Sequence, residues 1–189
     1  MTIGVLALQG SVAEHIKMIK SVNKKIDAVA VKTVDELAAV DALIIPGGES
    51  TTLRRLLNEF NLLIPIKERI LAGMPVWGTC AGLILLANRV EGEYPCLSVL
   101  DVDVKRNAYG RHSESFVGEG DFDGMYINMV FIRAPFITRV GDNVTVLAEC
   151  NDRPVAVRQG NVLATVFHPE MTRDNRVHKY FCGMIDAKV

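Results

Sequence analysis

The first half of the chain alternates between short continuous apolar runs and amphipathic stretches. A continuous apolar run is typical of a strand that is covered on both faces of its sheet. Such runs occur at residues 3–8, 28–31, 42–45 and 74–77. Residues 11–14 and 33–36 match the capping box that opens a helix. We therefore expect helices between the strands, the clearest at residues 11–22, 52–59, 64–71 and 81–88.

The pattern changes after Cys96. Segments that favour strands follow one another, joined by turn-rich stretches at residues 118–121 and 140–143. The predicted strands are residues 99–104, 125–132, 144–150, 154–158 and 162–167. The last segment has apolar residues at helical spacing, which predicts a C-terminal helix that packs on the sheet. These residues are Val177, Tyr180, Phe181, Met184 and Ile185.

Alternation of strands and helices at short spacing predicts an α/β fold. Its central sheet is expected to be mostly parallel, with helices on both faces. The strands of the second half predict a mixed or antiparallel extension of the same sheet. The sequence contains no internal repeat, low-complexity tract or linker. We therefore expect residues 1–189 to form a single domain.

Composition narrows the function classes. Apolar residues make up 49% of the chain, charged residues 23%, and the net charge is −1. These values exclude a disordered chain and an electrostatic nucleic-acid binder. The four cysteines are well separated and form no CxxC pair, which disfavours a disulfide framework or a zinc site. The first residues lack the features of a secretory signal. Their apolar stretch is too short to cross a membrane. We expect a cytoplasmic protein without metal or cofactor.

The strongest chemical signal is Cys80, which lies between two glycines in Gly78-Thr79-Cys80-Ala81-Gly82. A buried strand precedes it and a helix-like segment follows. This predicts a nucleophile elbow, a sharp strand-to-helix turn that projects the nucleophile into a cleft. The helix N-terminus would favour the thiolate. The alternative interpretation is a buried structural cysteine, because free cysteines are often buried.

His168 and Glu170 are candidates for the base and the orienting carboxylate that a nucleophilic cysteine needs. His168 directly follows an apolar strand, and Glu170 lies two residues further on. In an extended stretch these two side chains project to the same side, so the carboxylate can orient the imidazole. A third member, Cys80, would complete a Cys-His-acid triad. Taken alone, a His-x-Glu sequence is more often a pair of surface residues.

Gly47-Gly48 ends another predicted strand. Attack on a carbonyl creates an oxyanion that needs backbone N–H donors, and a glycine pair can adopt the dihedral angles that aim such donors. The amide of Ala81, directly after the nucleophile, would be the second donor. A simple turn is the alternative interpretation of the glycine pair. Ser50 does not lie at a predicted nucleophile elbow, so we expect it to cap the following helix rather than to act as a nucleophile.

The other histidines lack such a setting. His15 and His178 fall in predicted helices beside lysines, so we expect both to be solvated. His112 falls in a predicted loop and is expected to have no catalytic role.

Three motifs together resemble those of the class I, triad-type glutamine amidotransferases. They are Gly-Thr-Cys-Ala-Gly at 78–82, Pro-Gly-Gly-Glu-Ser-Thr-Thr at 46–52 and Phe-His-Pro-Glu at 167–170. Three further segments narrow the resemblance to one family within this class: residues 3–10 with Glu14 and His15, residues 106–111, and residues 130–135. With these segments, nearly the whole chain is similar to the glutaminase subunits of pyridoxal 5'-phosphate synthase.

The resemblance implies a flavodoxin-like amidotransferase fold and hydrolysis of L-glutamine to glutamate and ammonia. The ammonia would pass to a partner synthase subunit, which also activates the glutaminase. Cys80 would be the nucleophile, His168 the acid and base, and Glu170 the residue that orients His168. The glutamine pocket would be lined by Gly48, Glu49, Ser50, Arg106, Ile132 and Arg133. Gly47, Gly48 and Ala81 would form the oxyanion hole.

One position departs from the family pattern. Members often carry Gln after the second arginine of Arg-Asn-x-x-Gly-Arg, where this chain has His112. Arg106 is retained, so glutamine binding is still expected. Three alternatives stay open: a thiol peptidase or redox sensor, a glutaminase that serves another biosynthetic pathway, and a non-catalytic interaction subunit.

Overall fold

The computed structural model describes residues 1–106 and 115–186. Within this part a nine-stranded sheet forms the centre, in the order β2-β1-β3-β4-β12-β11-β10-β7-β8. Its first strands are mutually parallel: β2 (Asp27–Val31), β1 (Thr2–Leu6), β3 (Ala42–Ile45), β4 (Val76–Thr79) and β12 (Val162–Thr165). The others extend it with antiparallel pairing: β11 (Arg153–Gln159), β10 (Thr145–Cys150), β7 (Ser115–Phe122) and β8 (Met125–Ile132). The predicted α/β architecture is confirmed.

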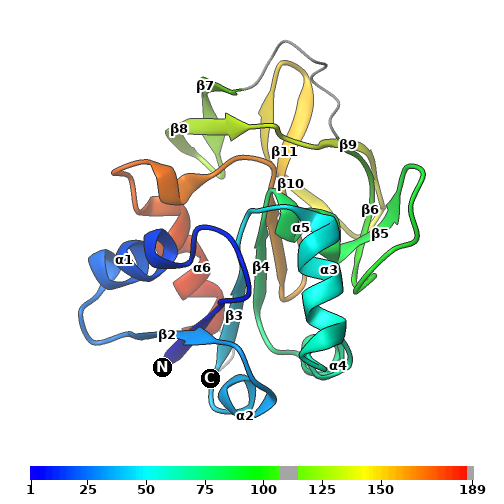
Figure 1. Cartoon of the computed structure of the whole chain (residues 1–189). Coiled ribbons are helices and arrows are strands. Elements are labelled where there is room, and N and C mark those ends of the chain that lie inside the picture. The colour runs from blue at the N-terminus through cyan, green and yellow to red at the C-terminus, as the bar shows by residue number, and fades with distance from the viewer. Residues whose placement is uncertain (107–114, 187–189) are drawn as a thin grey trace.

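Helices cover both faces of the parallel strands, as Figure 1 shows. One face carries α1 (Val12–Val22) and the C-terminal helix α6 (Arg176–Asp186), which pack against each other. The other carries α3 (Ser50–Glu59), α4 (Leu63–Leu71) and α5 (Ala81–Leu86), while α2 (Val34–Ala38) lies at the end of the sheet (Figure 1). Because both faces are covered, every residue of β3, β4 and β12 is buried, as their apolar runs predict.

A separate three-stranded sheet corrects the prediction of one continuous extension. It consists of β5 (Ala87–Val90), β6 (Leu100–Lys105) and β9 (Phe136–Val140). The predicted strand at 99–104 therefore belongs to this small sheet, where it pairs in parallel with β5. The helix expected to reach residue 88 ends at Leu86, because the next residues pair as β5.

Two local predictions are also wrong. The expected turn at residues 118–121 lies inside β7, where Gly118 and Gly120 let that strand pass close to Cys150 and Glu149. The capping box at Ser11 is absent, because the Ser11 hydroxyl makes no contact with its own helix. The second capping box is confirmed: Thr33 and Glu36 cap α2 reciprocally.

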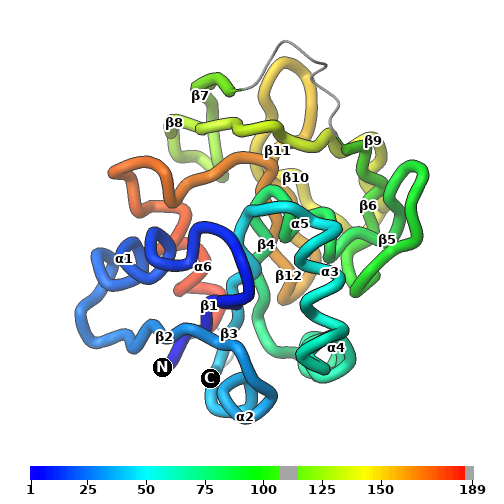
Figure 2. Tube along the Cα trace, viewed as in Figure 1, coloured from blue at the N-terminus to red at the C-terminus, as the bar shows by residue number. Residues whose placement is uncertain are grey.

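The parallel strands β4 and β12 lie side by side in the middle of the sheet (Figure 2). Their register pairs Thr79 with Thr165, so both strands end at the same level. Among the described residues, no helix is both long enough and apolar enough to cross a membrane.

Close packing of α5 on the sheet requires a glycine at position 82. A Cβ atom there would lie 2.1 Å from the carbonyl oxygen of Ile45 at the end of β3. A backbone oxygen cannot move away cheaply, so we expect Gly82→Ala to lower the free energy of unfolding by about 3 kcal/mol. Denaturant titration with circular dichroism measures this loss.

Gly183 is the matched control, because it is a helical glycine in α6 with no atom within 4 Å of an added Cβ. We expect Gly183→Ala to keep or raise stability by up to about 1 kcal/mol, since alanine is the better helix former. Equal losses in the two variants would contradict the packing argument.

Candidate active site

Cys80 occupies a sharp turn between β4 and α5. Its φ of 47° and ψ of −99° are unusual for a residue with a side chain, which indicates a turn held by its surroundings. The Cys80 amide donates to the carbonyl of Thr165 at 2.8 Å, and the Cys80 carbonyl accepts from Ile84 at 3.3 Å. The turn is therefore fixed by β12 on one side and by the first turn of α5 on the other.

His168 follows β12, so it lies next to Cys80 at the carboxyl end of the sheet. Its own amide donates to the carbonyl of Val130 in β8 at 2.8 Å. The imidazole is buried and lines the same cavity as Cys80. Burial alone would lower the pKa of His168, but the hydrogen bonds and charges of Cys80 and Glu170 raise it to about 10. This arrangement favours a thiolate beside an imidazolium.

Glu170 holds the far side of the imidazole. His168 Nδ1 donates to Glu170 Oε1 at 2.8 Å, and the Ser11 hydroxyl donates to the same oxygen at 2.6 Å. Burial would raise the pKa of Glu170, whereas His15, His168 and Ser11 lower it to about 2. The local backbone is a short 3-10 helix, η1 (Pro169–Met171), rather than the extended stretch expected from the sequence.

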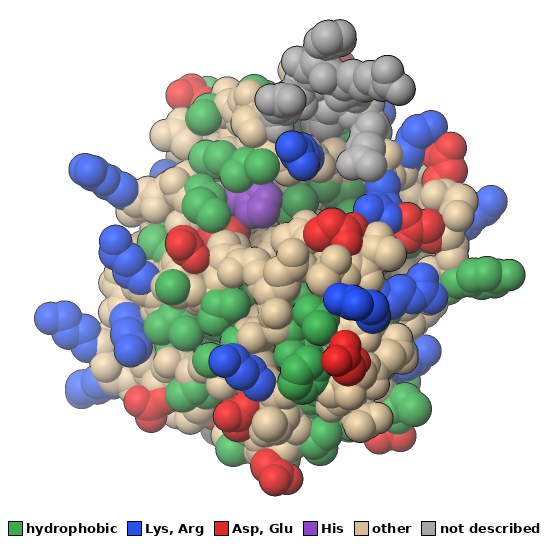
Figure 3. Space-filling model, in the orientation of Figure 1, with side chains coloured by type: hydrophobic (Ala, Val, Ile, Leu, Met, Phe, Trp, Pro, Cys, Tyr) green, Lys and Arg blue, Asp and Glu red, His purple; other side chains and the backbone are tan. Residues whose placement is uncertain are grey.

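A cavity of about 530 Å³ opens in front of Cys80 and His168. Its walls contain every residue that the resemblance assigned to the glutamine pocket and the oxyanion hole, while Glu170 lies behind His168. These lining residues are Gly47, Gly48, Glu49, Ser50, Ala81, Arg106, Ile132 and Arg133. Figure 3 shows part of a histidine side chain visible beside hydrophobic side chains on this face of the molecule.

Gly47 packs directly against the imidazole. A Cβ atom at this position would lie 2.3 Å from His168 Cε1, so only glycine allows the two to approach this closely. The thiol of Cys80 donates weakly to the carbonyl of Ile132 at 3.8 Å, across the cavity from the glycine pair. Two loops from different parts of the sheet thus confine the nucleophile.

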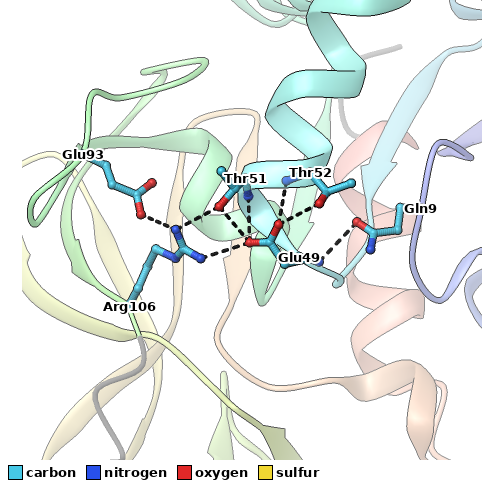
Figure 4. A network of polar contacts seen from close by, with 6 residues as sticks. All are labelled: Gln9, Glu49, Thr51, Thr52, Glu93 and Arg106. Atoms are coloured by element: carbon cyan, nitrogen blue, oxygen red, sulfur yellow. Dashed lines mark hydrogen bonds and ion pairs between the residues drawn. The ribbon is translucent and has the colours of Figure 1, made fainter.

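The charged wall of the cavity is a network around Glu49 (Figure 4). Glu49 caps α3 by accepting from the amides of Thr51 at 3.0 Å and Thr52 at 2.7 Å, and it pairs with Arg106 at 3.0 Å. Burial would raise the pKa of Glu49, but these amides and the threonine hydroxyls lower it to about 2. Arg106 also pairs with Glu93.

This network corrects the expected role of Ser50. The cap of α3 is Glu49, and Ser50 is the first residue of the helix. Ser50 lines the cavity, and its buried hydroxyl makes no hydrogen bond with any described residue. The remainder of the Arg106 loop, including His112, lies outside the described residues.

The prediction that His15 and His178 are solvated is wrong. His15 is fully buried and His178 is 1% exposed. His15 Nδ1 and His178 Nε2 are 3.1 Å apart, and both rings pack on Trp77. The helical spacing contained the signal, because His15 shares a face with Met18 and Ile19. His178 is spaced in the same way from Phe181 and Cys182.

Other residues of the site had no signal in the sequence. Ser11 belongs to a loop whose pattern indicated only a helix cap. Gly10, Pro135 and Met171 line the cavity through positions that only the tertiary fold brings together. None of the four cysteines forms a disulfide, and the described residues contain no group of three or more acidic, His or Cys side chains arranged to hold a metal.

This fold and this cysteine site define a glutamine amidotransferase. A solved structure described as a glutamine amidotransferase superposes with a TM-score of 0.92 and 45% identity, covering 97% of this chain and 98% of that one. The structure of PurLQS from Thermotoga maritima superposes with a TM-score of 0.69 at 14% identity, covering 99% of this chain and 97% of that one, which supports the fold alone.

More specifically, the chain belongs to the SNO glutamine amidotransferase family, whose sequence model matches residues 5–187. It is similar to the pyridoxal 5'-phosphate synthase subunit PdxT of Mycobacteroides abscessus, with 51% identity over 98% of this chain and 97% of the relative. The protein of the same name from Geobacillus thermodenitrificans is 49% identical over 98% of this chain and 95% of the relative.

The buried histidines make stability depend on pH. Burial lowers the pKa of His178 from 6.5 to about 3, so the unfolded chain binds a proton below pH 6.5 that the folded chain does not. Stability from this group is therefore complete above pH 6.5 and is lost as the pH falls towards 3. We expect a loss of about 2 kcal/mol between pH 7 and pH 5.

His178→Gln should remove this part of the dependence, because glutamine keeps a side-chain N–H donor but does not titrate. Urea unfolding of both proteins at pH 7, 6 and 5 measures the effect. If the free energy of unfolding fell equally with pH in the wild type and in His178→Gln, His178 would not be buried in its neutral form.

Proposed function

We propose that this chain hydrolyses L-glutamine to L-glutamate and ammonia, and that it delivers the ammonia to a synthase subunit that makes pyridoxal 5'-phosphate. The observation that carries the chemistry is the contact of Cys80, His168 and Glu170 at one wall of a cavity. The pathway rests on relatives near 50% identity, which are subunits of pyridoxal 5'-phosphate synthase.

In the proposed mechanism the Cys80 thiolate attacks the side-chain amide carbon of glutamine. The carbonyl π electrons move to oxygen, and the amides of Gly48 and Ala81 stabilise that oxyanion. The tetrahedral intermediate then collapses: the C–N bond breaks, His168 gives its proton to the nitrogen, and ammonia leaves. A thioester between Cys80 and the glutamyl group remains.

Water completes the cycle. His168, now neutral, takes a proton from the water as its oxygen attacks the thioester carbon. The C–S bond breaks, glutamate leaves, and the thiolate–imidazolium pair is restored. Glu170 keeps the imidazole oriented in both half-reactions and stabilises its positive charge.

The polar walls suit the other end of glutamine. Arg106 would bind the α-carboxylate, and Glu49 would attract the α-ammonium group. Ser50 offers a hydroxyl that has no hydrogen-bond partner among the described residues, and Ile132 and Arg133 also line the cavity. A free thiolate is also suited to a reducing cytoplasm, where we place the enzyme.

The first test is glutamine hydrolysis by the wild type and Cys80→Ala, each with and without the synthase subunit. We expect ammonia release from the wild type to rise when the synthase is added, and the alanine variant to lose at least about 10³-fold in kcat. Cys96→Ala is the control, because this half-buried cysteine lies outside the cavity. Ammonia release by Cys80→Ala at the wild-type rate would refute the mechanism.

A second test concerns the α-carboxylate. Arg106→Ala should raise KM for glutamine by about tenfold or more and change kcat little, because the lost contact exists in both ground and transition states. Steady-state kinetics with the synthase present separates the two constants. Lys105→Ala is the matched control, since this neighbouring cation pairs with Glu91 outside the cavity. An unchanged KM in Arg106→Ala would remove Arg106 from the substrate site.

A further inference from the structure

The second carboxylate oxygen of Glu170 is buried without a hydrogen bond. Oε1 accepts from both His168 and Ser11, whereas Oε2 makes no hydrogen bond with any described residue. An unpaired oxygen on a buried carboxylate is costly, because water cannot reach it. The side chain of His15 lies close to this oxygen, with its Nε2 3.5 Å from Oε2.

His15 continues into a second buried histidine. Its Nδ1 lies 3.1 Å from His178 Nε2, and its Nε2 lies 3.3 Å from the Thr79 hydroxyl. His15 comes from α1, His178 from α6 and Thr79 from the last position of β4. Elements from both ends of the described chain therefore meet behind the triad.

The contacts favour one arrangement of protons. If His15 carries its proton on Nε2, that N–H lies within 3.5 Å of both the Thr79 hydroxyl and Glu170 Oε2, and its Nδ1 accepts from Nε2–H of His178. The group of His178 without a partner among the described residues is then the lone pair of Nδ1 rather than an N–H; Glu170 Oε2 also makes no hydrogen bond with them. The opposite tautomer would point a lone pair at the carboxylate and leave an N–H of His178 buried without an acceptor. The opposite tautomer costs more free energy, because the carboxylate oxygen and a buried N–H donor both stay unpaired.

We propose that His15 is a positioning residue of the triad, which donates from Nε2 to Glu170 Oε2 and is itself held in the required tautomer by His178. The carboxylate is then fixed at both oxygens, and its Oε1 stays directed at His168. The 3.5 Å separation is longer than the about 2.7–2.9 Å of a charge-assisted hydrogen bond, so the proposed hydrogen bond requires a closer approach of Nε2 to Oε2 during the reaction.

The surroundings keep both histidines neutral. Burial lowers the pKa of His15 despite the charge of Glu170; His168 lowers it further, and Glu14 acts in the opposite direction. Burial and His15 lower the pKa of His178. A neutral His15 supplies a donor without a second positive charge that would compete with the His168 imidazolium.

The wild-type protein gives a direct test by NMR. With ¹⁵N-labelled histidine at pH 7, we expect His15 and His178 both to be neutral and protonated on Nε2, with signals assigned through His15→Asn and His178→Gln. A His15 that carries its proton on Nδ1, or that is charged, would overturn the proposal. This measurement does not depend on any variant being active.

Two substitutions at position 15 separate positioning from packing. Glutamine places an amide nitrogen near the position of Nε2, whereas asparagine reaches only the position of Nδ1. With the synthase present, we expect His15→Asn to lower kcat by about tenfold or more, the effect of losing a hydrogen bond to a charged group, with KM unchanged. His15→Gln should stay within about threefold of the wild type.

The pH profile distinguishes these roles further. Without the donor the pKa of Glu170 rises, so this carboxylate is protonated and lost as a partner of His168 at a higher pH: the acid limb of kcat should move to higher pH in His15→Asn and stay in place in His15→Gln. Thermal unfolding is measured for both. Equal losses of activity with acid limbs at the wild-type pH would show a merely structural role and refute the proposal.

The measurements of kcat and KM rest on the proposed glutaminase function. Alkylation of the Cys80 thiol does not depend on that function. Reaction of Cys80 with iodoacetamide is followed by mass spectrometry of its peptide across pH, in the isolated chain. We expect the acid limb of this reaction to shift upward in His15→Asn only. If the wild type releases no ammonia with the synthase, the proposed function fails while this shift still supports the role of His15; unshifted alkylation overturns that role.

Discussion

The parallel pairing of β4 with β12 is the constraint on which the site depends. Thr79 and Thr165 are opposite each other, and the next amide in the chain, that of Cys80, is held by the Thr165 carbonyl. Because both strands run in the same direction, the residues that follow them leave the sheet at the same edge. The strand pairing thus brings the proposed nucleophile, Cys80, close to its proposed base, His168.

Behind that edge the protein buries an unusually polar layer. Glu170, His15 and His178 are all nearly inaccessible to solvent, in a fold whose interior is mostly apolar. Burying these groups costs free energy, which their mutual contacts and the hydroxyl of Ser11 offset. Such a layer also fixes how α1 and α6 pack, since a displaced helix would leave a carboxylate or an imidazole unpaired.

The sequence predicts the parallel strands well, because strands covered on both faces read as unbroken apolar runs. It also directs attention to Cys80, His168 and the glycine pair, which all follow such runs. It misses the small sheet, since β5 begins immediately after α5 without a turn signal. The predictions for His15 and Ser11 are wrong for a different reason. A histidine beside lysines and a serine before a helix give no indication in the sequence of which residues they contact in the fold. Those contacts exist only once α1 and η1 lie together.

The same strand order has a consequence for synthesis of the protein. The cysteine lies before the middle of the chain, whereas its base, its carboxylate and α6 come from the last part to leave the ribosome. A nascent chain therefore carries the thiol long before it can carry the means to activate it. The non-local pairing of β12 with β4 must close an intervening segment that includes β5 to β11, which makes it an intrinsically slow step. Catalytic competence is in this sense a late event of folding, and a chain interrupted before β12 would retain the cysteine without a base to activate it.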